Sequence, residues 1–149
     1  MIVVLRKEHY EQIIQVWENA VRATHDFLKE EDILFYKQKI FDEYLDAVDL
    51  YGYRDRKETL LGFLGLSQQS IQMLFIHSAA RGLGIGKKLL QFAIDEKGMK
   101  YVDVNEQNEQ AVGFYKHMGF VVNDRSITDD LGKPYPILSM ELNNKNAII

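Results

Sequence analysis

The sequence predicts a single α/β domain, in which about four helices flank a mixed sheet of about seven strands. Short apolar runs of strand length recur along the chain, and segments with apolar residues at helical spacing lie between them. The resulting order is β-α-α-β-β-β-α-β-α-β-β. Because three strands follow one another in the middle of this order, the pattern differs from a doubly wound fold.

Each element follows from a local pattern. From His9 onward, apolar residues recur at the spacing of a helix with one buried face, to which Trp17 belongs. A break at residues 24–27 precedes a second helix over about 31–45, and a helix after residue 84 ends near Gly98. A polar turn at 54–57 joins two strands into a hairpin. The fourth helix covers 108–118, and the expected strands are residues 2–5, 47–53, 60–66, 72–77, 101–105, 120–124 and 137–142.

Composition limits the possible functions. The 149 residues are 46% hydrophobic and 27% charged, with net charge −4, as in an ordinary soluble domain. We expect one domain over residues 1–142 and a loose tail over 143–149. Without a basic face, nucleic acid is not an expected partner, and without a long apolar stretch neither a signal peptide nor a membrane span is expected. The absence of cysteine excludes disulfides and thiol catalysis and fits a cytoplasmic location.

The most distinctive segment is Arg81-Gly82-Leu83-Gly84-Ile85-Gly86-Lys87-Lys88, which follows a predicted strand and opens a helix. Its glycines let the backbone pass close to a ligand. The start of the helix offers unpaired N–H groups and the positive end of the helix dipole, and three cations surround it. This combination predicts a phosphate or pyrophosphate site.

Counting excludes two common phosphate motifs. A P-loop has four residues between its first glycine and a Gly-Lys pair that precedes Ser or Thr. Here Gly82 and Gly86 enclose three residues, and Lys88 follows the pair. A dinucleotide-binding fingerprint would need glycine at position 87, which is Lys.

Two motifs together resemble the GNAT N-acetyltransferases. The first is Arg81…Gly84…Gly86 after a central strand, and the second is Asn-Glu-Gln-Ala-Val-Gly-Phe-Tyr-Lys-His-Met-Gly-Phe at 108–120. The element order matches the family over nearly the whole chain, which implies a mostly antiparallel central sheet. Segments 24–28, 105–108 and 129–136 are similar to the small bacterial YjaB-type members.

The resemblance implies acetyl-CoA as cosubstrate. The loop N–H groups would bind its pyrophosphate, and one strand would pair its backbone with the pantetheine arm beside a diverging next strand. On the fourth helix, Asn108 would offer an amide, Ala111 would leave room and Tyr115 would protonate the departing thiolate. Tyr115 also fits a core tyrosine. The implied cofactor-binding residues are Leu74, Phe75, Ile76, Arg81, Gly82, Leu83, Gly84, Ile85, Gly86, Lys87, Asn108, Ala111 and Tyr115.

The general base is open. Many family members carry a glutamate where this chain has Gln72, which cannot accept a proton. His25 has the best intrinsic pKa for the task, although it also fits a histidine at a helix end. Asp26 is another candidate, although it is rather expected to be the N-cap of the second helix. Asn105 would hold the acceptor or a catalytic water, and Glu106 is a further candidate or a solvated loop residue.

The expected activity is direct transfer of the acetyl group of acetyl-CoA to a primary amine of a small molecule or peptide. Two alternatives are a non-catalytic acetyl-CoA-binding sensor or subunit, motivated by Gln72, and an ATP-binding regulator. Acidic residues at 129–136 hint at a cationic acceptor, and Tyr135 would line its pocket or anchor the loop. The scattered histidines predict no metal. Monomer and homodimer both remain open.

Overall fold

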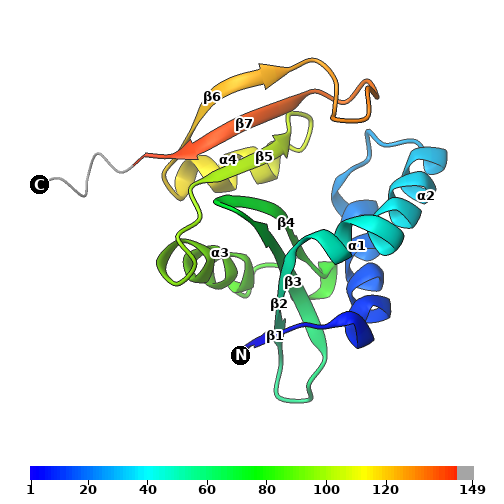
Figure 1. Ribbon diagram of the computed structural model, residues 1–149, viewed down its shortest axis with the longest axis vertical. Helices are drawn as coiled ribbons and strands as arrows, with labels where there is room; N and C mark the ends of the chain where they lie inside the picture. The colour runs from blue at the N-terminus through cyan, green and yellow to red at the C-terminus, as the bar shows by residue number, and fades with distance from the viewer. Residues whose placement is uncertain (144–149) are drawn as a thin grey trace, which may run out of the picture. The chain divides into compact units, whose positions relative to one another are not determined.

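The computed structural model describes residues 1–143, which form seven strands and four α-helices in the predicted order (Figure 1). The predicted fold class is therefore confirmed. The chain forms two compact units, Met1–Met99 and the part from Lys100 onward. That residues 1–142 form a single domain stays a prediction, and the expected loose tail lies, apart from Asn143, outside the described residues.

The first unit is built on four strands, each antiparallel to the next, and the predicted central hairpin is confirmed. Alternate side chains of these strands point to opposite faces, so each face receives its own helix. The strands are β1 (Ile2–Val4), β2 (Asp49–Arg54), β3 (Leu60–Ser67) and β4 (Ser70–Ile76).

Helices α1 (Tyr10–Thr24) and α3 (Ile85–Asp95) lie on opposite faces of this four-stranded sheet (Figure 1). The apolar stripe of α1, including Trp17, shares a core cluster with Phe63 of β3. On the other face, the ring of Tyr51 in β2 packs edge-on against Phe92 of α3, with centroids 5.0 Å apart. The predicted core role of Trp17 is confirmed, and it is 4% exposed.

The segment between α1 and β2 departs from the prediction in detail. Helix α2 spans Glu30–Lys39 and has Lys29 as its N-cap, without a capping side-chain hydrogen bond. The expectation that Asp26 caps this helix is therefore wrong, because the chain runs on for three residues before the helix begins. A π-helical turn (Ile40–Tyr44) and a 3-10 turn (Leu45–Ala47) then complete the predicted helical segment.

The second unit has three strands, in which β7 lies between β5 and β6 and is antiparallel to both. Helix α4 (Glu109–His117) packs against β5 and β6 of this unit. Tyr115, Phe120 and Met140 are buried there. The strands are β5 (Tyr101–Asn105), β6 (Phe120–Ser126) and β7 (Ile137–Leu142). Across the described residues, no helix has the length and apolar character needed to cross a membrane.

Candidate active site

The glycine-rich loop joins β4 to α3, and its backbone requires glycine. Gly82 and Gly84 have φ angles of +82° and +78°, a left-handed conformation that costs other residues about 1–2 kcal/mol. A Cβ atom added to either residue would meet no protein atom within 4 Å. The buried side chain of Ile85 anchors the start of α3 beneath the loop. The loop thus leaves open space directly beside its backbone.

This loop also presents a run of unused hydrogen-bond donors. Within the described part of the chain, the backbone N–H groups of residues 82–87 donate to no other group. The first helical bond runs from the Lys88 N–H to the Gly84 carbonyl, at 3.1 Å. Consecutive free donors at the positive end of a helix favour an anion. This geometry suits the phosphate or pyrophosphate group that the sequence predicts.

The cations of the loop differ in their surroundings. Arg81 and Lys87 are exposed. The ammonium of Lys88 instead lies 5.5 Å from the centroid of the Tyr53 ring, a cation–π contact that directs this side chain toward β2. Lys87 is therefore better placed than Lys88 to add charge beside the free N–H groups.

The predicted pantetheine strand is β4. Its residues Leu74, Phe75 and Ile76 pair with Leu64, Phe63 and Gly62 of β3. The Phe75 ring stacks on Phe63 with centroids 5.7 Å apart, and it lies 6.4 Å from the His25 ring. The side chain of Phe75 thus belongs to the face covered by α1, and only its backbone is available for the predicted role.

His25 lies at the C-terminal end of α1 and is 6% exposed. Its ring packs beside those of Phe27 and Phe75. Burial lowers the pKa of His25 from 6.5 to about 4, and the nearby carboxylate of Asp26 offsets only part of this effect. The imidazole is therefore neutral at neutral pH.

Thr24 fixes the tautomer of this imidazole, a role that the sequence analysis missed. The Thr24 hydroxyl donates to the Ala20 carbonyl at 2.8 Å, and its oxygen lies 2.7 Å from Nδ1 of His25. Because the single hydroxyl hydrogen is used, Nδ1 must be the donor in the second bond. Nε2 of His25 therefore carries the lone pair. The only sequence signal was a threonine directly before histidine at a helix end.

Tyr115 is buried between neighbouring rings of its own unit. It packs edge-on against Phe114 and Phe120, and it is 6% exposed. Burial raises the pKa of its phenol above the usual value of 10.0. Among the described residues, the Tyr115 hydroxyl has no hydrogen-bond partner. Every fully buried side-chain oxygen of these residues does have a partner, so the Tyr115 hydroxyl is not fully buried and reaches solvent. The core interpretation holds for the ring, and the hydroxyl stays available.

The amides near α4 have partly structural roles. Asn108 is the N-cap of α4, and its Oδ1 accepts from the Ala111 N–H at 3.2 Å. Its NH₂ group is what remains for a ligand. Asn105 ends β5 opposite Ile137, and its carbonyl accepts from the Asn108 N–H at 3.0 Å. The structure thus brings Asn105, Asn108 and Ala111 together around the start of α4.

The remaining candidates are more constrained. Both oxygens of Glu106 accept from Arg125 at 2.8 Å, and this pairing lowers the pKa of Glu106, which makes it a poor base. Tyr135 is buried, as expected for a residue that anchors its loop. Gln72 is exposed on β4. Among the described residues, no three His, Asp or Glu side chains form a group that could hold a metal.

Comparison with known proteins identifies the family of this chain. The acetyltransferase (GNAT) domain model matches residues 10–133 of the chain. The chain belongs to the GNAT acetyltransferase family. This GNAT chain is 41% identical over 138 residues to the peptidyl-lysine N-acetyltransferase YjaB of Escherichia coli (strain K12), covering 91% of both proteins. The predicted family resemblance is thus confirmed.

Solved structures agree with the family. The solution structure of apo-form YjaB from Escherichia coli matches with a TM-score of 0.87 and 40% identity, over 95% of each chain. The crystal structure of the PaiA N-acetyltransferase from Thermoplasma acidophilum, in complex with coenzyme A, matches with a TM-score of 0.68 and 25% identity, over 93% of this chain and 98% of that one. The GNAT chain is therefore an acetyl-CoA-dependent N-acetyltransferase, and the relatives argue against a non-catalytic binding module.

Proposed function

We propose that this GNAT acetyltransferase transfers the acetyl group of acetyl-CoA directly to the side-chain amine of a lysine in a peptide or protein. Its relative YjaB is a peptidyl-lysine N-acetyltransferase, which supports this class of acceptor. The chain has no cysteine that could carry an acyl-enzyme intermediate. Both substrates are therefore expected to bind before the transfer.

The loop between β4 and α3 is proposed to hold the pyrophosphate of acetyl-CoA. The observation that carries this assignment is the run of free N–H groups at residues 82–87 beside open space. Arg81 and Lys87 would add charge to the phosphates. The backbone of Leu74, Phe75 and Ile76 is proposed to bind the pantetheine amides, with the NH₂ group of Asn108 as a further donor and Ala111 leaving room.

Tyr115 is proposed as the general acid. The raised pKa of its buried phenol keeps the proton on the oxygen at all physiological pH values, and its hydroxyl reaches solvent. A thiolate leaving group has a pKa near 8.5 in the cysteine reference, so it is a weak base that gains from a hydrogen bond as negative charge develops. A positioned phenol supplies that hydrogen bond and the proton.

Nε2 of His25 is proposed to accept a hydrogen bond from the acceptor amine, or from the water that takes its proton, because a pKa lowered to about 4 makes the imidazole itself a weak base. A lysine ammonium with a pKa near 10.4 is neutral in about one molecule in a thousand at neutral pH, so deprotonation has to precede attack. The neutral ring and its fixed tautomer offer the required lone pair. Asn105 is proposed to hold the acceptor or the water.

The acceptor class is tested with a peptide that contains a single lysine and a blocked N-terminus. Acetyl-CoA and this peptide should give free thiol and acetyl-peptide in equal amounts, whereas the matched peptide with arginine in place of lysine should give neither. Spermidine and free amino acids serve as competing acceptors. Transfer to spermidine at a much higher kcat/KM than to the lysine peptide would replace the proposed acceptor with a small polyamine.

A further inference from the structure

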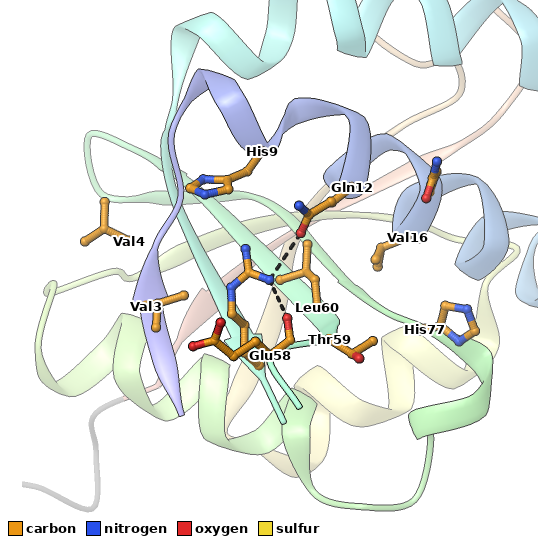
Figure 2. A pocket seen from close by; sticks show the side chains of 11 residues that line it. Val3, Val4, His9, Gln12, Val16, Glu58, Thr59, Leu60 and His77 are labelled. Atoms are coloured by element: carbon orange, nitrogen blue, oxygen red, sulfur yellow. Dashed lines mark hydrogen bonds between the residues drawn. The ribbon is translucent and has the colours of Figure 1, made fainter. Parts of the chain in front are cut away.

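The first unit carries a groove that includes none of the residues assigned to acetyl-CoA. Its volume is about 790 Å³, within the range of small-molecule sites. Side chains from β1, α1, the β2–β3 hairpin and the end of β4 converge on it (Figure 2). Its polar lining residues are His9, Gln12, Gln15, Arg54, Glu58, Thr59 and His77, and its apolar ones are Val3, Val4, Val16 and Leu60.

Arg54 lines this groove and is held there by one of its three guanidinium nitrogens. Its Nη1 donates to Oε1 of Gln12 at 3.1 Å and to the Glu58 carbonyl at 2.7 Å (Figure 2). In the described part of the chain no carboxylate lies within 4.0 Å of its guanidinium, and Nε and Nη2 donate to nothing. The free edge of the guanidinium is the fork that binds a carboxylate through two parallel hydrogen bonds.

Two histidines in the groove are fixed as donors. Nδ1 of His9 accepts from the Arg6 N–H at 2.9 Å, and Nδ1 of His77 accepts from the Ala79 N–H at 3.0 Å. A ring nitrogen that accepts carries no proton, so the hydrogen of each ring lies on Nε2. Nε2 of His9 lies 3.7 Å from a carboxylate oxygen of Glu8, too far for a hydrogen bond.

The other polar groups follow the same pattern with one exception. Because Oε1 of Gln12 accepts from Arg54, the NH₂ group of Gln12 is what it offers to a ligand. The Thr59 hydroxyl can also donate. The exposed carboxylate of Glu58 is the exception and would repel an anion. Of the apolar lining residues, Val4 is exposed and Val3 is half-buried, so these two offer a ligand more apolar surface than the buried Val16 and Leu60.

We propose that this groove binds a small organic carboxylate, with the free edge of Arg54 on the carboxylate and the apolar part of the ligand against the apolar side chains of the lining, above all Val3 and Val4. The converging donors select an oxyanion. The apolar lining selects an organic acid over inorganic phosphate. This site is separate from the acetyl-transfer reaction, so its failure and that of the proposed function are independent.

The test is calorimetric titration of the full chain with hexanoate, with hexanamide and inorganic phosphate as matched probes. Hexanoate should bind saturably with one site per chain, and Arg54→Gln should weaken this binding about tenfold or more, since a charge-assisted hydrogen bond is lost. The control is Arg56→Gln, which removes the same charge from the exposed hairpin turn outside the groove and should change the affinity less than twofold. Glu58→Gln should strengthen it.

Three results would overturn the proposal. Equal loss of hexanoate affinity in the Arg54 and Arg56 variants would show that the loss comes from the change in net charge and not from a contact between Arg54 and the carboxylate. Hexanamide binding as tightly as hexanoate would exclude a carboxylate site. Phosphate binding as tightly as hexanoate would exclude the contribution of the apolar lining. Thermal denaturation of each variant at the titration temperature verifies that loss of binding is not loss of folding.

Discussion

Replacing Gly84 with alanine tests the phosphate loop without removing any charge. The residue has φ of +78°, so the new Cβ should cost about 1–2 kcal/mol of stability. Gly98, just beyond the end of α3, has φ of +69°, and a Cβ there also meets nothing within 4 Å. Gly84→Ala and Gly98→Ala therefore carry the same backbone strain, and only the first adds an atom beside the free N–H groups.

Both variants should lose a similar few degrees of Tm, because about 1 kcal/mol corresponds to about 2–4 °C in a chain of this size. CoA affinity, measured by calorimetry, should fall about 10- to 100-fold in Gly84→Ala, the equivalent of one charge-assisted hydrogen bond. It should stay within about twofold in Gly98→Ala. Equal CoA affinity in the two variants would refute the assignment of the pyrophosphate to this loop.

Three further outcomes follow from the structure. The pKa of His25 is about 4 in the native state and 6.5 in the unfolded chain, so the unfolded state binds an extra proton between these two pH values. The free energy of unfolding should therefore fall by about 2 kcal/mol from pH 7.5 to pH 5. Urea titrations should find this part of the pH dependence missing in His25→Gln. Thr24→Val should lower kcat and leave acetyl-CoA affinity unchanged. Thr24→Ser keeps the hydroxyl and should have the kcat of the wild type, so equal kcat values in the two variants would exclude control of the His25 tautomer by Thr24. Leu89→Ala, at a position with 0% exposure in α3, should cost about 2–5 kcal/mol by urea denaturation, and a loss below 1 kcal/mol would contradict its core placement.

Local patterns predicted the elements because burial and periodicity act over a few neighbouring residues. The stripe of α1, the β2–β3 hairpin and the start of α3 after Gly84 all follow from spacing within one segment. The N-cap of α2 did not, because Asp26 and Lys29 both come shortly before the helix and only the path of the chain distinguishes them. The π-helical turn at Ile40–Tyr44 likewise has no local signature.

The side-chain environments were harder to predict because they combine distant segments. The neutral state of His25 depends on burial against Phe75, about fifty residues away along the chain. The role of Thr24 could not be predicted from the sequence, because it requires that its hydroxyl contact both the Ala20 carbonyl and the His25 ring. The groove lined by Arg54 is formed by four separate segments of the chain, and none of these segments carries a sequence motif.

The role of Tyr115 is the central claim about catalysis, and its most direct test is the rate of acetyl transfer to the lysine peptide by Tyr115→Phe. The control is Tyr101→Phe, which removes a phenol hydroxyl from a residue of the same unit that is 40% exposed. A general acid is worth about 10²–10⁴-fold, so kcat should fall by at least about 100-fold in the Tyr115 variant, with acetyl-CoA affinity within about twofold of wild type. The Tyr101 variant should match the wild type. A Tyr115→Phe enzyme with the kcat of the wild type would contradict the account.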